Sequence, residues 1–246
     1  MAVNDDRVVR VWTQVAQQSR GATVSVAHVC AAAVADVGVD GAGVTVMASP
    51  AARDTVHATD AVASELEQLQ ITLGQGPCLD TFADGGPVLA VDLRARDYQT
   101  RWPAFAPAAL RSGAGAVFAL PLQVGAIRLG AMDLYRRRPG ELRQPQLADA
   151  LAYAEAVCML LLDMAGGAPP GTAESARRRD DPTAHQAVVH QATGMVLVQL
   201  GVSADAALVR LRAHAFAQDR PLAAVARDVV ERRLRFKPDP PGGHPR

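Results

Sequence analysis

A glycine- and proline-rich stretch divides this chain into two parts with different patterns. Residues 165–182 read AGGAPPGTAESARRRDDP and show no apolar periodicity. Such a composition cannot form a packed element and is typical of a linker. We therefore expect a folded part at residues 5–165, a linker at 166–182 and a second folded part at 183–236. The last residues, 237–246, read KPDPPGGHPR and are expected to form a disordered tail.

The composition favours a globular protein without a disulfide framework. Hydrophobic residues make up 49% of the 246 residues, which is enough for a sizeable core. The three cysteines, Cys30, Cys78 and Cys158, are odd in number and form no CxxC pair, so we predict neither disulfides nor a metal site. No signal peptide or membrane span is visible, and we expect a cytoplasmic protein.

The first part mixes helical and strand patterns. Apolar residues recur every three to four positions in segments that we predict to be helices, at 6–18, 24–37, 63–70 and 144–164. Short segments rich in valine, alanine and leucine predict strands at 43–49, 54–60, 86–93, 115–124 and 126–136. The last two strands meet at Val124 and Gly125, as in a hairpin. We expect an α+β domain with an antiparallel sheet flanked by helices.

The second part contains only helical patterns. We expect helices at 183–200, 204–218 and 220–236, with Gly201 ending the first helix. Ser203 and Asp219 are the expected N-caps of the second and third helices. The apolar stripes that should meet in one core are Val189, Ala192, Val196 and Leu200; Ala207, Leu208, Leu211 and Ala215; and Leu222, Val225, Ala226 and Val229. A unit this small is marginal alone, so dimerisation or docking is expected.

Charge is distributed unevenly between the two parts. Residues 1–165 hold 13 arginines and 17 acidic residues, whereas residues 183–246 hold 9 basic and 5 acidic residues. The net charges of −4 and +4 indicate that the C-terminal part meets an anionic partner.

Motifs for catalysis are lacking in the sequence. The segment GQGPCLD has Leu79 where a dinucleotide-binding loop needs its third glycine, and there is no GxSxG, HExxH or P-loop. We therefore predict no enzymatic activity, and no cofactor is evident. Cys78 follows Pro77 at an expected helix start, where a thiol can acquire a lowered pKa and act as a sensor. The alternative, which we favour, is a small buried residue that fills a turn.

Small and basic side chains lie together in the helical part. His190, Thr193 and Gly194 share one face of the first helix because they are three and four residues apart. A glycine there costs about 1 kcal/mol relative to alanine. Basic residues lie on the second and third helices, namely Arg210, Arg212, His214 and Arg220. Short side chains beside basic ones would let a base or a phosphate approach the backbone, so we expect a docking surface.

The segment from His190 to Val230 resembles the ANTAR domain, an RNA-binding antitermination module. The resemblance rests on the Ala192–Gly194 step, the Gly201–Ser203 turn, the Ala207–Arg212 helix and the Arg220–Ala226 helix. Many members have lysine where this chain has Thr193. The resemblance implies that Arg212 and Arg220 contact phosphates or bases. It also implies that His190, Thr193, Gly194 and Ala215 shape the surface for a loop base, while Arg210 and His214 could be contacts or solvated groups.

The first part resembles a GAF domain, a ligand-sensing α+β fold, through the segment around GQGPCLD. Together the two resemblances imply a homodimer that pairs through helices before and within the ANTAR domain. Such a protein binds paired stem-loops with six-base loops in nascent mRNA and prevents terminator formation, with RNA polymerase involved only indirectly. An unknown small ligand could occupy the GAF-like domain.

Two other functions suit the same patterns. Three short helices also occur in helix-turn-helix regulators that bind DNA, but the mixed charges of Arg227, Asp228 and Glu231 suit a DNA backbone poorly. The third alternative is a ligand- or redox-sensing dimer that binds no nucleic acid and senses through Cys78.

Overall fold

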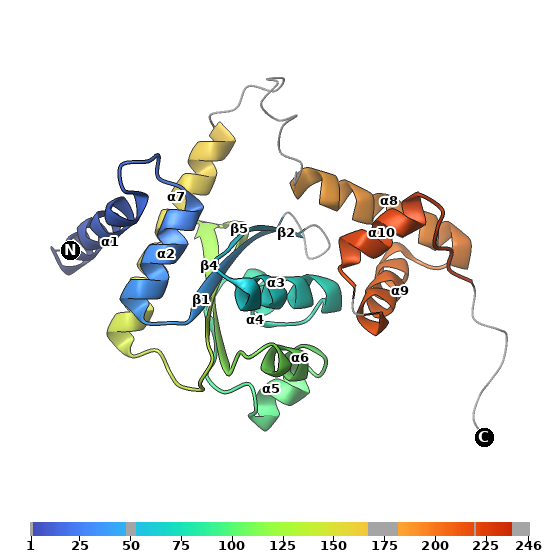
Figure 1. The fold of residues 1–246 in the computed structure, drawn as a ribbon, viewed down its shortest axis with the longest axis horizontal. Coiled ribbons are helices and arrows are strands. Elements are labelled where there is room, and N and C mark those ends of the chain that lie inside the picture. The colour runs from blue at the N-terminus through green and yellow to red at the C-terminus, as the bar shows by residue number, and fades with distance from the viewer. Residues whose placement is uncertain (1, 48–52, 167–181, 219, 238–246) are drawn as a thin grey trace. The chain divides into compact units, whose positions relative to one another are not determined.

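The computed structural model describes residues 2–47, 53–166, 182–218 and 220–237 (Figure 1). The chain forms two compact units, Met1–Arg179 and Asp180–Arg246. Residues 167–181 of the linker predicted at 166–182, and most of the predicted tail, lie outside the described residues, so both assignments stay predictions. The two end residues of the predicted linker, Gly166 and Pro182, belong to helices.

The first unit is built on a five-stranded antiparallel sheet in the order β2-β1-β5-β4-β3. The strands are β1 (Gly41–Met47), β2 (Arg53–Ala58), β3 (Val88–Ala90), β4 (Ala116–Val124) and β5 (Ile127–Arg136). The predicted hairpin is confirmed, since Val124 pairs with Ile127 and Gly125 adopts the left-handed conformation at φ 59°. The predicted α+β class with an antiparallel sheet is confirmed as well.

Helices cover both faces of this sheet (Figure 1). One face carries α1 (Ala2–Ser19), α2 (Val26–Val37) and α7 (Gln144–Gly166). The other face carries α3 (Ala61–Leu73), α4 (Pro77–Asp84), α5 (Arg96–Arg101) and α6 (Phe105–Arg111). The period of two along a strand separates the cores: Met132 and Leu134 of β5 pack under α2 and α7, and Tyr135 packs under α3 and α6.

Helices α5 and α6 are not predicted by the sequence pattern. Pro103 and Pro107 interrupt this segment, and prolines argue against helix in a sequence read alone. In the structure Pro103 lies between the two helices, and Pro107 lies in the first turn of α6, where the missing amide hydrogen costs nothing. Trp102 and Phe105 anchor the pair, because both side chains are fully buried and pack edge to face.

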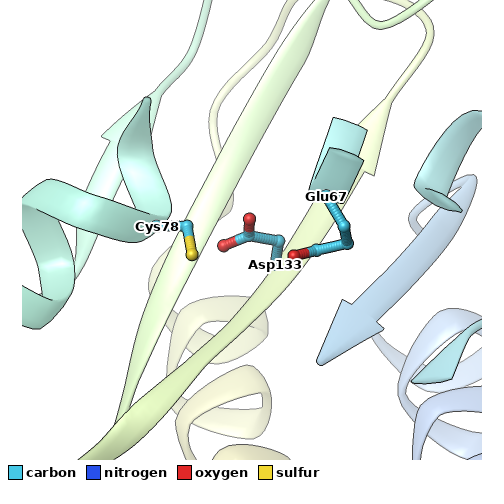
Figure 2. A group of neighbouring side chains, drawn as sticks. All are labelled: Glu67, Cys78 and Asp133. Carbon is cyan, nitrogen blue, oxygen red and sulfur yellow. The ribbon is translucent and has the colours of Figure 1, made fainter. Parts of the chain in front are cut away.

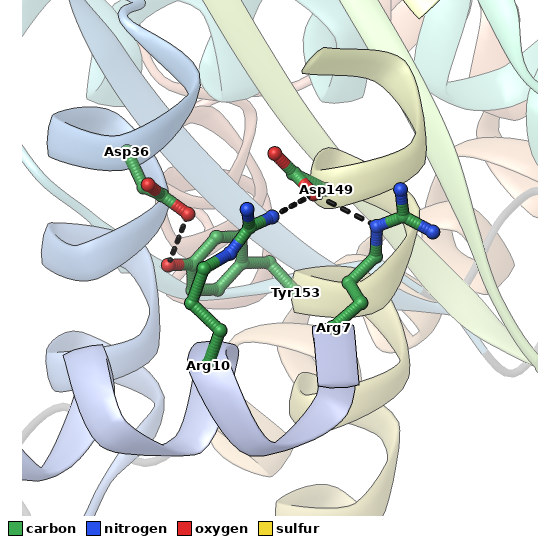
Figure 3. Close-up of polar contacts among 5 residues, drawn as sticks. All are labelled: Arg7, Arg10, Asp36, Asp149 and Tyr153. Carbon is green, nitrogen blue, oxygen red and sulfur yellow. Dashed lines mark hydrogen bonds and ion pairs between the residues drawn. The ribbon is translucent and has the colours of Figure 1, made fainter. Parts of the chain in front are cut away.

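Polar contacts tie α1 and α2 to α7 (Figure 3). Asp149 of α7 accepts hydrogen bonds from Arg7 and Arg10 of α1, and the Arg7 Nε to Asp149 Oδ1 distance is 2.8 Å. Tyr153, one turn further along α7, donates its hydroxyl to Asp36 of α2 at 3.0 Å. Because Tyr153 is buried beside Asp36, the pKa of its phenol is raised above the ordinary value. These contacts fix the register of three helices on one face of the sheet.

The second unit consists of three helices that pack against one another: α8 (Pro182–Leu200), α9 (Ala204–Ala217) and α10 (Leu222–Val230). Gly201 ends α8 in the left-handed conformation, and the Ser203 hydroxyl accepts a hydrogen bond from the Ala206 amide, as predicted. The fully or nearly fully buried residues are Ala192, Val196, Ala207, Leu208, Leu211, Ala215, Leu222, Val225, Ala226 and Val229. The predicted stripes thus meet in one core; only Val189 and Leu200 lie at its partly buried edge.

The predicted third helix is too long at both ends. Pro221 precedes the first helical residue, and Asp219, the predicted cap, lies outside the described residues. At the other end Arg232 adopts the left-handed conformation at φ 62°. The Arg232 amide then bonds the Val229 carbonyl, and the Arg233 amide bonds the Asp228 carbonyl, which is the pattern of a Schellman cap. Because residue 232 is arginine rather than glycine, the sequence pattern does not predict that the helix ends here.

We expect Ser203→Ala to loosen α9 locally. The Ser203 hydroxyl satisfies one of the amides that a helix leaves free at its start, and replacing such a cap by alanine costs about 1 kcal/mol. Hydrogen exchange of the α9 amides in the full chain should accelerate about five-fold. Ser203→Gly should change the rate much less, since glycine tolerates the same cap conformation. Equal acceleration in both variants would contradict the capping role.

Candidate functional site

The α8 surface around Gly194 is open in this chain. Gly194 is exposed, and a Cβ atom built on it would meet no heavy atom within 4 Å. Its neighbour Thr193 donates its hydroxyl to the Val189 carbonyl at 2.8 Å and so is turned back onto its own helix. Since internal packing does not require a glycine here, its cost to α8 is not offset within the described residues. The backbone of His190 lies on the same helix, but its side chain is outside the described residues.

The predicted basic residues of α9 do not share one face. Arg210 and His214 lie one turn apart, whereas Arg212, halfway between them, faces the other side of the helix. Arg210 is exposed, but Arg212 is partly buried, and this burial lowers the pKa of its guanidinium. An arginine held partly in the protein surface can present a rigid planar fork, which suits a base or a phosphate.

His214 packs against the segment that follows α10. Its ring meets the Phe236 ring edge to face at a centroid distance of 5.3 Å, and its Nε2 is buried with no hydrogen-bond partner among the described residues. The Phe236 amide donates to the side chain of Gln199 on α8 at 2.8 Å. His214 therefore takes part in holding residues 231–237 against the three helices.

Arg220 carries an internal ion pair. Its Nη2 lies 2.6 Å from Asp228 Oδ2, and Asp228 also binds Arg233 through Oδ1 at 2.8 Å. Hydrogen bonds from Arg220 and then Arg233 hold the pKa of Asp228 below its ordinary value. Arg233 also pairs with Glu231. Asp228 thus fixes the position of Arg220 just before α10. The Arg220 guanidinium has five N–H donors, and this contact does not use all of them.

One predicted surface residue is misplaced and several basic residues were missed. Ala215 is fully buried in the three-helix core, so its predicted place on the docking surface is wrong; the apolar spacing of α9 already pointed to the core. Residues Arg227, Arg232, Arg235 and Lys237 are exposed at the end of the unit. The run ERRLRFK at 231–237 contains all of them except Arg227 and could have indicated them. The sequence instead predicted residues 231–236 as the end of a long helix and Lys237 as the start of the tail.

The first unit places Cys78 in its interior. Cys78 is 2% exposed in the first turn of α4, and burial, followed by the charges of Asp133 and Glu67, raises the pKa of its thiol well above 9.0. The hypothesis of a thiol with a lowered pKa is therefore wrong, because desolvation outweighs the helix N-terminus. The alternative of a buried residue that fills a turn agrees with this placement.

Two buried carboxyl groups lie next to Cys78 (Figure 2). Glu67 comes from α3 and Asp133 from β5, and one donor atom of each of the three residues lies within 4.8 Å of the others. The Thr45 hydroxyl donates to Glu67 Oε2 at 2.6 Å, and Gln70 Nε2 donates to Asp133 Oδ2 at 2.5 Å. Burial is the largest cause that raises the pKa of both carboxyl groups. The pKa of Asp133 reaches about 7.

Small residues make room for these acids on the sheet. Asp133 pairs with Gly43 of β1 on one side and with Ala119 of β4 on the other. A Cβ atom on Gly43 would lie 2.2 Å from Glu67 Oε1, so only glycine leaves space for that carboxyl group.

None of the helices in the described residues is long and apolar enough to span a membrane.

Comparison with known proteins identifies the second unit. Residues 183–230 match the family model of the ANTAR domain, so the C-terminal unit is an ANTAR domain. No curated protein matches the chain.

The chain is also similar to three solved structures with GAF domains. The GAF domain of a phosphoenolpyruvate-protein phosphotransferase from Acinetobacter is 7% identical, with a TM-score of 0.49 over 70% of this chain and 99% of that one. The corresponding domain from Coxiella burnetii is 10% identical, with a TM-score of 0.49 over 65% and 95%. A GAF domain/HD domain protein from Geobacter sulfurreducens is 15% identical, with a TM-score of 0.47 over 61% and 100%.

The buried acids should make stability depend on pH. With a pKa of about 7 when folded and 3.8 when unfolded, Asp133 keeps its proton only in the folded state between these values. Its stabilising contribution is therefore complete below about pH 4 and is lost as the pH rises to about 7. Glu67 shifts in the same direction, Cys78 also faces Asp133, and Arg53 is the nearby cation. Asp133→Asn should remove part of this dependence, up to about 1.4 kcal/mol per pH unit.

Urea unfolding of both proteins from about pH 4 to pH 8, with a chelator present, measures the effect. The difference in unfolding free energy should move in favour of Asp133→Asn as the pH rises. Parallel curves would show that Asp133 is already ionised in the folded protein.

Proposed function

We propose that this chain is an RNA-binding transcription antitermination regulator. The observation that carries the proposal is the ANTAR domain at residues 183–230, formed by three helices with a closed apolar core. ANTAR domains are RNA-binding antitermination modules, and the C-terminal part of this chain has the basic charge that such a partner needs. The target is a pair of stem-loops with six-base loops in nascent mRNA, and binding prevents the terminator from forming.

Loop bases are the part of RNA that this surface can recognise. The major groove of A-form RNA is too narrow for side chains, whereas unstacked loop bases expose their faces and edges. The open backbone at Gly194 leaves room for a flat base, since no described atom outside the adjacent helix backbone lies within 4 Å of an added Cβ atom. Thr193 is uncharged, where many ANTAR domains have a lysine. The positive charge that attracts RNA must therefore come from other residues of the unit.

Arg212 and Arg220 are the arginines that we propose as contacts. Both are held in place before RNA arrives, Arg212 by partial burial and Arg220 by its ion pair with Asp228. Fixing a side chain in advance reduces the entropy that binding would otherwise cost. Arg210 and His214 remain secondary candidates, and His214 contributes by holding the segment around Phe236.

The first unit is proposed to be the GAF-like sensory domain and the site of dimerisation. Its helices present apolar side chains to solvent: Val8 and Val9 of α1, and Met159, Leu162 and Met164 of α7. Because α1 and α7 pack against each other, both helices can contribute to one interface. Burial of such a face against a second copy would pair two RNA-binding domains, as two stem-loops require.

RNA binding should depend on the Gly194 surface and on the two arginines. Gly194→Leu should weaken binding to an RNA with two six-base-loop hairpins at least ten-fold without destabilising α8, because its side chain meets open space. Arg212→Ala and Arg220→Ala should each cost about 1–3 kcal/mol of binding if they contact bases. A phosphate contact would instead lower the salt slope by about 0.7.

Binding is measured at several fixed salt concentrations, against the same RNA with scrambled loops and against duplex DNA. Matched controls in the first unit are Ala83→Leu at an exposed position of α4 and Arg111→Ala at an exposed position of α6. Equal affinity for all three nucleic acids would exclude loop recognition. A preference for duplex DNA would favour a helix-turn-helix regulator.

Dimerisation should depend on the exposed side of α7. Leu162→Asp combined with Met159→Asp places two charges on side chains that are 43% and 60% exposed, so the fold of one chain should be unaffected. Sedimentation analysis should show a shift from dimer to monomer. Ile127→Asp at the β4–β5 turn, 66% exposed, is the matched control and should remain dimeric. A dimer that survives the double change would place the interface elsewhere.

A further inference from the structure

The buried cluster of Glu67, Cys78 and Asp133 has the composition of a metal site rather than of a core. Its three side chains come from α3, α4 and β5, and all are almost completely inaccessible to solvent. Buried carboxyl groups are rare unless they are paired or bind metal, because removal from water is costly. Here two carboxyl groups and a thiol face one another (Figure 2), and the buried Arg53 acts on Cys78 as a nearby positive charge.

An independent observation points into the cluster. Asp133 is 3% exposed, and its Oδ1 atom accepts no hydrogen bond from an amide, a hydroxyl or a guanidinium among the described residues. The Glu67 carboxyl group can act as its hydrogen-bond partner only when one of the two acids holds a proton. Figure 2 shows the Asp133 carboxyl group between the Cys78 sulfur and the Glu67 carboxyl group. A buried acceptor left in this way needs a proton or a cation to satisfy it.

The surrounding residues orient the three donors. The Gln70 amide donates to Asp133 Oδ2, and its carbonyl oxygen accepts the Cys78 amide at 2.8 Å. The Thr45 hydroxyl holds Glu67 Oε2. Hydrogen bonds of this kind to the second oxygen of a carboxylate are typical of the groups that position metal ligands.

We propose that Glu67, Cys78 and Asp133 bind one divalent transition-metal ion of the Zn²⁺ class, with a fourth coordination position left open. A tetrahedral ion with bonds of 2.0–2.3 Å holds its ligand atoms about 3.3–3.8 Å apart. The donor atoms already lie within 4.8 Å of one another, so small side-chain rotations close the site. The thiolate selects a transition metal over Mg²⁺ or Ca²⁺, which prefer oxygen alone.

Charge balance supports the divalent state. Three ionised ligands carry three negative charges, and the buried Arg53 guanidinium acts on Cys78 as a positive charge. A divalent ion cancels two of these three negative charges, and the positive charge of Arg53 lies close by, so the cost of burying the ionised ligands is lowered. A small exogenous ligand could bind the metal ion at the open fourth coordination position. This proposal does not depend on whether the second unit binds RNA.

The test uses purified full-length protein, stripped with a chelator and titrated with Co²⁺ and then Zn²⁺. We expect one Co²⁺ per chain, a sulfur-to-cobalt charge-transfer absorption band, displacement by Zn²⁺ and a higher unfolding temperature with Zn²⁺. Cys78→Ser should abolish the band, whereas Cys158→Ser, a change at another buried cysteine, should keep it. Gln70→Leu should weaken Co²⁺ binding about 10- to 100-fold, because Gln70 only positions Asp133.

Asp133→Asn and Glu67→Gln keep the shape of the side chains and remove one ligand charge each. Each should lower the affinity for Co²⁺ at least 100-fold while circular dichroism stays unchanged; if one variant fails to fold, the other decides. Absence of Co²⁺ binding to the wild type, a band that survives in Cys78→Ser, or full affinity in both carboxyl variants would overturn the proposal. The two acids would then share a proton instead.

Discussion

The pairing register of β5 against β1 determines both faces of the first unit. Asp133 lies opposite Gly43, and this pair points toward α3 and α4, while Met132 and Leu134 point toward α2 and α7. A slip of one residue would send the acid into the apolar core and the apolar residues toward Glu67. The register is held on both sides, because β4 also pairs with β5 along its whole length.

Much of the fold could be predicted from the sequence, because its elements are long or clearly periodic. The hairpin at Gly125, the caps at Gly201 and Ser203 and the apolar stripes of the three C-terminal helices follow local rules. The missed features depend on tertiary contacts. The short α6 helix persists because Phe105 is buried, and α10 ends early because Arg232 takes a conformation that usually calls for glycine.

The buried cluster was beyond sequence reasoning for a physical reason. Its members lie on different elements and have no spacing that marks a metal site. Cys78 was considered as a thiol at a helix start or as a small buried residue that fills a turn, and Gly43 as the first residue of a predicted strand. Nothing in the sequence indicates that Gly43 leaves room for Glu67. Only the folded sheet brings these side chains together.

The RNA-binding surface was easier to anticipate in composition than in geometry. Arg220 was predicted as a contact from the resemblance to the ANTAR domain, yet its orientation depends on Asp228, eight residues further on. If Arg220 contacts RNA as proposed, that ion pair has two opposite effects on binding: it reduces the net positive charge, but it holds the guanidinium in one place. For an exposed pair the electrostatic gain is small, so the positional effect is the larger consequence.

A sensory role requires that a ligand bind two states of the protein with different affinity. In the first unit, side chains next to the buried cluster pack in the core that supports α7. Asp133 in the buried cluster is followed in β5 by Leu134 and preceded by Met132, and both pack in the core that contains Tyr153 of α7. A change of charge at Asp133 therefore acts on a strand whose opposite face supports the helix with the exposed apolar side. If that side forms the dimer, occupancy of the cluster would alter the pairing of two RNA-binding domains without any direct contact between ligand and RNA.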